Sequence, residues 1–446
     1  MAGYPPDSLV TVRPFNHRFD GDTVIIGDVG RQVFLAIPAE GLNILEWLAA
    51  GRTVGEAAEL YEEKYHETVD IEDFLEAIEQ EGFIGEASAV AAGEVPVVVR
   101  PHWKWRFGWI TPGAAQRLVS RPALVIYGLI VAAGVALAID DPTVMPYRGG
   151  DVLLFPDHIG QLMLTWFTLS MGTVLLHEMG HVIAARAAGV PTGLGFGNLL
   201  WWITAQTDMS SIWLAEPRKR YLAFAAGTIV DGVSSAFLIA FIWQDHRGWI
   251  SSPPWAAQLA TALLLTNLAR IVWQNSFYIR TDVYYIIATA KKCKNLMGDT
   301  EDYVRNLRAR LRGAPPRHDQ SGIPARERQV IRRFAWAWFI GRIGAFAFYG
   351  YLTIPVLWRY GSELILLVTG QPTQYSSFDF AVFGILVLSV HGIGITMWFR
   401  GLYRGAQARR RLDSSRLADG AKAAPLRVAP ETEVVPAAVE ASSRVA

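Results

Sequence analysis

Six long apolar runs, separated by charged turns, constrain the fold of this chain more than any other feature. Each run is long enough to cross the roughly 30 Å hydrocarbon core of a bilayer as a helix. Only 18% of the 446 residues are charged, whereas soluble domains average about 25%. We therefore predict a mainly α-helical membrane protein with six spans, rather than a soluble protein with buried helices. The runs cover residues 122–139, 159–188, 221–243, 255–279, 334–358 and 380–399.

Charges between the runs predict how the spans are oriented. Lysine and arginine gather before the first run, between the second and third, between the fourth and fifth, and after the sixth. Basic loops stay on the cytoplasmic side of a membrane. We expect a multi-pass protein of the cytoplasmic (inner) membrane, embedded in the lipid bilayer, with both termini cytoplasmic. The alternate loops hold acidic residues instead, namely Asp140, Asp141, Asp151, Asp157, Asp245 and Glu363.

The first 84 residues contain no apolar run of membrane length and instead show short amphipathic segments. One of these segments begins with Thr53 and has Glu56 three residues later, a capping-box pattern that starts a helix. Strands followed by three short helices suggest a small α+β, winged-helix-like domain. The expected strands cover residues 24–27 and 31–38, and the expected helices cover 39–50, 53–66 and 70–80.

The chain is therefore predicted to have four parts. Residues 1–84 form the small domain, and residues 85–120 form a linker and cytoplasmic lead-in. Residues 121–400 form the membrane domain, which contains a cytoplasmic loop over 289–333. Residues 401–446 are a basic and then disordered tail. The single cysteine, Cys293, excludes an intramolecular disulfide framework and a multi-cysteine metal site.

The second run contains the residues that point most directly to chemistry, His177-Glu178-Met179-Gly180-His181. Residues four apart share one face of a helix, so both imidazoles can reach one tetrahedral metal ion. Glu178 lies beside that position and can take a proton from an activated water molecule. Two histidines and a glutamate inside hydrocarbon are costly without a function. The pattern predicts a Zn²⁺ site with Glu178 as the catalytic base.

Catalytic zinc sites usually have three protein ligands, so a further ligand is needed. Asp282 is a candidate because it lies just beyond the cytoplasmic end of the fourth run. The second and fourth runs point in the same direction, which places His177, His181 and Asp282 on the same side of the membrane. Position alone favours a solvated aspartate at a helix end.

Other polar residues in the apolar runs have a structural explanation. Asp231 in the third run and Arg270 in the fourth are expected at similar depth. We predict that they form an intramembrane ion pair with Arg342 nearby, because a lone buried charge is very unfavourable. Residues 189–202, rich in glycine and aromatic residues, are predicted to form a re-entrant or interfacial segment that lines the cleft.

The HEMGH helix and the later segment with Asn275, Asp282, Tyr284 and Tyr285 resemble the site-2 protease class, and within it the bacterial peptide zinc metalloproteases. The resemblance covers roughly residues 100–400. In the bacterial peptide zinc metalloproteases, the distal motif has the form Asn-Pro…Asp-Gly-Tyr-Tyr.

The resemblance implies roles for five residues. His177, His181 and Asp282 would bind zinc, Glu178 would be the base, and Asn275 would help to position substrate. This chain departs from the motif in two places, with Ser276 where the family favours proline and Val283 where it favours glycine.

The N-terminal part resembles PqqD-like recognition elements, which bind leader peptides of ribosomally synthesised, modified peptides. The strand pair at 27–38, the spacing Leu42, Leu45, Leu48 and the closing Gly82-Phe83-Ile84 carry this resemblance. Winged-helix domains also bind DNA, but residues 40–81 are strongly acidic, which disfavours phosphate contacts and a nucleic-acid partner. A domain that only packs against the membrane part is the remaining alternative. The acidic residues are Glu40, Glu46, Glu56, Glu59, Glu62, Glu63, Glu67, Asp70, Glu72, Asp73, Glu76, Glu79 and Glu81, against Arg52 and Lys64.

Together these features predict a membrane zinc endopeptidase that acts in the maturation or export of a modified peptide. Its expected partners are a peptide substrate with a leader segment and a peptide exporter. Two alternatives stay open: a regulatory intramembrane protease that releases a signalling protein, and a non-hydrolytic partner in a peptide maturation or export complex.

Overall fold

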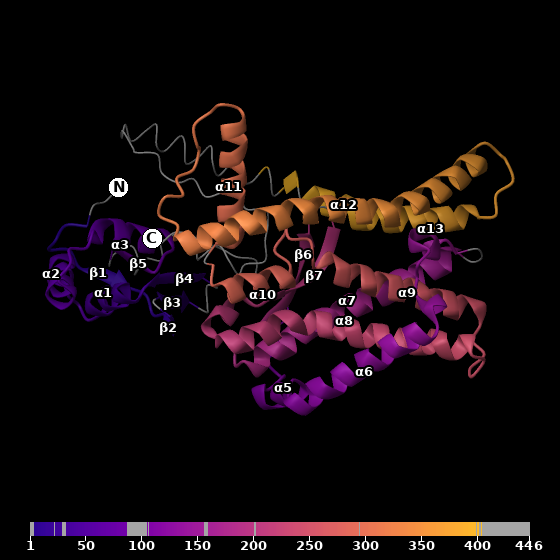
Figure 1. Ribbon diagram of the computed structural model, residues 1–446, viewed down its shortest axis with the longest axis horizontal. Coiled ribbons are helices and arrows are strands. Elements are labelled where there is room, and N and C mark those ends of the chain that lie inside the picture. Colours follow the sequence, from indigo (N-terminus) through magenta and orange to yellow (C-terminus); the bar gives the residue numbers. More distant parts are fainter. Residues whose placement is uncertain are drawn as a thin grey trace.

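The structure is a computed structural model that describes residues 4–21, 23–28, 33–86, 105, 107–155, 159–199, 202–293, 295–397, 399–400 and 403. It is mainly helical, with a small N-terminal part of strands and short helices at one end of the molecule (Figure 1). Most of the predicted linker and nearly all of the predicted C-terminal tail lie outside the described residues.

The N-terminal part contains two small antiparallel sheets and three helices. Strands β2, β3 and β4 form one sheet in that order, and β1 pairs with β5. The structure thus has the expected strands followed by three helices, whereas its likeness to a winged helix stays a prediction. The elements are β1 (Val10–Val12), β2 (Asn16–Asp20), β3 (Thr23–Asp28), β4 (Val33–Pro38), α1 (Ala39–Ala49), α2 (Val54–Tyr65), α3 (Ile71–Gln80) and β5 (Ile84–Glu86).

The predicted capping box at the start of α2 is confirmed. The Thr53 hydroxyl accepts a hydrogen bond from the Glu56 amide at 3.2 Å, and the Glu56 carboxylate accepts one from the Thr53 amide at 3.1 Å. Two orphan amides of the first turn are thereby satisfied. The core beneath these helices is apolar and includes Val24, Ile26, Leu45, Leu75 and Phe83.

Five helices are long and apolar enough to cross a membrane among the residues that the structure describes, so the chain has the character of a membrane protein. Helix α8 contacts α6, α7 and α9, helix α7 also contacts α9, and α12 extends along this group (Figure 1). The five are α5 with α6 (Pro112–Leu118 and Arg121–Asp140), α7 (Ile159–Ala187), α8 (Pro217–His246), α9 (Pro254–Trp273) and α12 (Ala325–Val368).

The sixth predicted run is helical over residues 377–397 in the described part of the chain, but a π-helical turn interrupts its α-helix, and the run is not among the α-helices of membrane length. Helix α13 (Ser377–Val387) has 11 residues and continues into a π-helical turn, η4 (Leu388–Gly392). Ser376 caps α13 through a second capping box with Asp379. A sixth span is therefore not established by the structure.

The predicted helix over residues 255–279 is too long. Helix α9 ends at Trp273, and the chain makes tight turns until α10 (Asp282–Lys291) begins. The Thr281 hydroxyl accepts a hydrogen bond from the Tyr284 amide and so caps α10. An apolar run continues across this break, which is why hydropathy alone could not locate it.

Residues 193–199 and 202–208, which include more than half of the predicted re-entrant segment, form a pair of antiparallel strands, called the hairpin below. Its strands are β6 (Gly193–Leu199) and β7 (Trp202–Asp208), and Trp105 bridges to Leu194 on β6. Strand β7 contacts α7. The hairpin therefore places an extended backbone beside the helix that carries the histidines.

Close approach between α7 and α8 requires a small residue. A Cβ atom on Gly180 would lie 2.9 Å from the carbonyl oxygen of Ala226. The two backbones can therefore come this near only because Gly180 has no side chain. Around this contact, the main core of the membrane part includes Ala223, Phe224, Tyr284 and Tyr285.

The N-terminal sheet packs against a short helix of the membrane part, η3 (Ser210–Leu214). Arg220 is only 3% exposed and forms an ion pair with Asp20 at 2.8 Å. It also donates to the carbonyls of Trp213 and Ala215. Arg18 donates to the carbonyl of Leu214 at 3.2 Å. These bonds fix the small domain to the loop between β7 and α8.

Candidate metal centre

Helix α7 places His177 and His181 on one face, one turn apart. Both side chains are buried, at 5% and 3% exposure. Their Nε2 atoms lie 3.2 Å from each other. The helix spacing that the sequence suggested is therefore realised as two converging imidazole nitrogens.

Asp282, the first residue of α10, completes a group of three. Its Oδ2 atom lies 3.4 Å from Nε2 of His177 and 3.2 Å from Nε2 of His181. Contacts between α10 and α8 bring this residue to the site. The structure thus brings together the three residues that the sequence proposed as metal ligands.

Hydrogen bonds on the opposite side of each ring determine which nitrogen faces this group. Nδ1 of His177 donates to Asp231 at 2.8 Å, and Nδ1 of His181 donates to the carbonyl of Ala223 at 2.8 Å. A neutral imidazole has one N–H, so the hydrogen on Nδ1 leaves a lone pair on each Nε2. We assign these tautomers from the bonding partners.

Three lone pairs therefore converge with no proton between them. Oδ2 of Asp282 is a buried oxygen without a hydrogen-bond donor among the described residues. A cation would satisfy all three atoms, which is the donor set expected of zinc.

Space for such an ion is provided by Gly227 on α8. A Cβ atom there would meet the Nε2 atoms of both His177 and His181. Any larger residue would fill the position toward which the ligand atoms point. The absent side chain and the orphaned oxygen together show that the residues fit a metal ion.

Glu178 lies next to this group and is held by a residue that sequence analysis did not assign. The hydroxyl of Thr207, on β7, donates to Oε2 of Glu178 at 2.7 Å. The same hydroxyl lies 3.1 Å from the Glu178 carbonyl oxygen. No local spacing could have revealed this contact, because it depends on how the hairpin packs against α7.

Asn275, the predicted substrate-positioning residue, is not joined to the group by any hydrogen bond in the described part of the chain. Its side chain is exposed, and its amide donates to the carbonyl of Val272. Gln274 is nearer to the centre, since its side-chain oxygen accepts from the Asp282 amide at 3.1 Å. Gln274 thus orients the start of α10, a role the sequence did not indicate.

The structure contains the Asp231–Arg270 ion pair, with Nη2 of Arg270 2.6 Å from Oδ1 of Asp231. The expected position of Arg342 beside this pair is wrong. Its guanidinium lies over the rings of Tyr278 and Trp338 instead. Aromatic faces stabilise that cation without a carboxylate.

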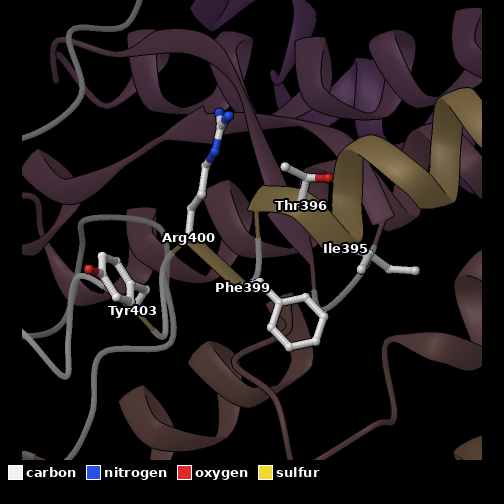
Figure 2. A pocket seen from close by; sticks show the side chains of 5 residues that line it. All are labelled: Ile395, Thr396, Phe399, Arg400 and Tyr403. Carbon is white, nitrogen blue, oxygen red and sulfur yellow. The ribbon is translucent and has the colours of Figure 1, made fainter.

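A surface pocket elsewhere has no features of a reactive site. Figure 2 shows that the polar ends of Arg400, Thr396 and Tyr403 point away from one another, so they do not converge on one position. Its lining consists of Ile395, Thr396, Phe399, Arg400 and Tyr403.

The fold and the site define a helical membrane protein with a buried His-His-Asp group that could hold one metal ion. Comparison with models of known families, with curated proteins and with solved structures finds no match.

Proposed function

We propose that this protein is a membrane-embedded zinc-dependent endopeptidase. One observation carries the proposal: His177, His181 and Asp282 converge on a position kept open by Gly227, with Glu178 beside it. Two imidazoles and one carboxylate are a common ligand set of catalytic zinc. A carboxylate base next to the ligands is what hydrolysis further requires.

When bound, zinc would supply Lewis acidity that polarises a peptide carbonyl and lowers the pKa of a water molecule. Glu178 would accept a proton from that water at Oε1, because Oε2 is held by Thr207. Attack of the water oxygen forms the new C–O bond. Glu178 then donates the proton to the amine as the C–N bond breaks.

The membrane arrangement in this proposal has six spans, the last of which includes α13 and the helical residues after it. Both termini and the metal centre would face the cytoplasmic side of the inner membrane. Arg220, which holds the N-terminal domain, follows the basic residues Arg218 and Lys219. Basic residues favour the cytoplasmic side, so domain and centre would share it.

The N-terminal domain would bind the leader segment of a ribosomally synthesised peptide. A pocket at its junction with the membrane part is lined by residues from both, among them Asn16, Arg18, Pro191 and Lys219. A leader held there would raise the effective concentration of the scissile bond at the metal. A peptide exporter would then take the product.

Substitution of Glu178 by glutamine tests the proposal. The Glu178→Gln variant is expected to keep its zinc but lose cleavage of short precursor peptides by at least about 100-fold, as expected when a general base is removed. Purified protein, zinc content and mass spectrometry of the products provide the measurement. Equal cleavage by wild type and variant would contradict the proposed mechanism.

One observation also favours a regulatory protease. The N-terminal domain packs on η3, and η3 follows directly after β7, whose Thr207 holds Glu178. A sensor domain in this place could influence the base. Cleavage of a membrane-anchored signalling protein, but not of a leader-bearing peptide, would support this second function. The Ser276 and Val283 departures instead favour a non-hydrolytic partner, which wild-type cleavage of either substrate would exclude.

A further inference from the structure

Asp231 does more than neutralise Arg270. It is completely buried within α8, and its two oxygens have three partners. Oδ1 accepts from Nη2 of Arg270 at 2.6 Å. Oδ2 accepts from Nε of Arg270 at 2.9 Å and from Nδ1 of His177 at 2.8 Å. The carboxylate therefore connects the intramembrane cation to a proposed metal ligand.

Arg270 is held in turn by Asn267 on its own helix and by Thr173 on α7. Its Nη2 atom donates to Oδ1 of Asn267 at 2.9 Å, and Nη1 donates to the hydroxyl of Thr173 at 3.4 Å. Asn267 is completely buried. The hydrogen-bond network thus joins α7, α8 and α9, which fixes the Asp231 carboxylate relative to His177.

The two histidines differ in the partner of Nδ1. His181 donates to a neutral backbone carbonyl, whereas His177 donates to a carboxylate. A carboxylate partner fixes the tautomer and ring orientation of a metal-bound histidine and strengthens it as a donor. If the Asp231–Arg270 pair served only to neutralise charge, Asp231 would not need its hydrogen bond to His177.

We propose that Asp231 is a positioning residue for the metal centre, acting through Nδ1 of His177, and that Arg270 holds this carboxylate in place. The inference rests on the proposed function, because it assumes that the centre binds zinc. Asp231 touches neither the metal nor the substrate in this account. Its effect on the metal passes through the orientation of the His177 ring.

The test measures zinc affinity of the full-length, detergent-purified protein by competition with a chromophoric chelator. Asp231→Asn removes the charge at constant size. Asp231→Asn/Arg270→Gln also removes the unpaired cation that the first change leaves behind, so it preserves folding if the single variant does not. Both are expected to bind zinc about 10- to 100-fold more weakly than wild type.

Two further readouts separate positioning from a structural role. The first readout uses protein in which cobalt has been substituted for zinc. The visible d–d absorption of both variants is expected to differ from that of wild type, because His177 is less well oriented. Thermal unfolding of the metal-free proteins measures the structural contribution by itself. Glu363→Gln is the matched control: it breaks the Arg359–Glu363 pair in α12, at 3.1 Å, and should leave zinc affinity unchanged.

A double variant with wild-type zinc affinity and an unchanged cobalt spectrum would overturn the inference, while zinc binding by wild type would leave the proposed function standing. Wild type without zinc would overturn the proposed function itself. The two failures are therefore distinguishable.

Discussion

Single atoms determine whether this site can hold a metal ion. The Nε2 atoms of His177 and His181 face the centre because each Nδ1 has an acceptor on the opposite side. The position between them stays open because residue 227 has no side chain. At this scale, ring orientation and one missing methyl group matter more than the overall hydrophobicity of the helix.

Gly227→Ala is expected to abolish stoichiometric zinc binding, because the new methyl group would occupy the space between the imidazoles. Zinc content by mass spectrometry measures this effect. Gly172→Ala in α7 is the matched control, since nothing lies within 4 Å of its Cβ position. Full zinc occupancy in Gly227→Ala would show that the metal binds elsewhere.

Cys293 provides a pH-dependent prediction outside the membrane-spanning helices. Burial raises the pKa of its thiol to about 11, with Glu327 and Asp299 contributing further. Since only the thiolate reacts, alkylation should accelerate about tenfold per pH unit from pH 7 to pH 10. Cys293 is the only cysteine, so the label reports one site.

Unfolding the protein provides the control for this prediction. A free thiol has a pKa of about 8.5, so alkylation of Cys293 at pH 8 should become about 200-fold faster in denaturant. Equal rates in the folded and unfolded protein would contradict the burial of this side chain.

Elements bring together residues that are distant in sequence. Strand β7 supplies Thr207 to Glu178, 29 residues away, and α8 supplies Asp231 to His177, 54 residues away. Helix α10 begins with Asp282 because Thr281 caps it there. The break between α9 and α10 therefore positions Asp282 in the site.

Removal of the Thr207 hydroxyl tests the role of the hairpin. Thr207→Val should keep zinc but reduce kcat about tenfold, since a hydrogen bond of about 1–1.5 kcal/mol no longer orients Glu178. Thr204→Val is the control on the same strand, because that hydroxyl donates only to the carbonyl of Ala205. Equal kcat for both variants would show that the hairpin does not position the base.

The sequence predicted one part of this site well and another part not at all. The spacing of His177 and His181 is local, so a helix was enough to place them on one face. The third ligand came from resemblance, since position alone favoured a solvated aspartate at residue 282. Thr207, Gln274 and the bond from His177 to Asp231 depend on tertiary packing and left no signal in local patterns.

The same distinction explains the fold. Five of the six apolar runs correspond to helices of membrane length in the described residues, because length and hydropathy are properties of one segment. The hairpin at 193–208 was not recognised as paired strands, since pairing depends on contacts between segments. Hydropathy also missed the end of α9 at Trp273.

On the scale of the whole molecule, the N-terminal domain is fixed to the membrane part close to the hairpin. Asp20 pairs with the buried Arg220, and Leu214 packs against the domain core. The pair lies at the start of α8, the helix that also contains Gly227 and Asp231. The contact that docks the N-terminal domain and two residues next to the metal ligands therefore lie on the same helix.

Asp20→Ala is expected to loosen this docking by about 1–3 kcal/mol, because the buried Arg220 loses its carboxylate partner. Hydrogen exchange should accelerate in β2 and η3 but not around His177. Glu59→Ala, on the exposed side of α2, is the control and should change neither. Unchanged exchange in Asp20→Ala would show that the ion pair does not hold the domain.

The zinc content of wild type beside His181→Ala and Asp282→Ala tests the metal centre itself. We expect one zinc ion per chain in wild type and loss of that zinc in both variants. Zinc retained in Asp282→Ala would contradict the proposed third ligand. A wild-type protein purified without zinc, and unable to take it up, would contradict the metal centre as a whole.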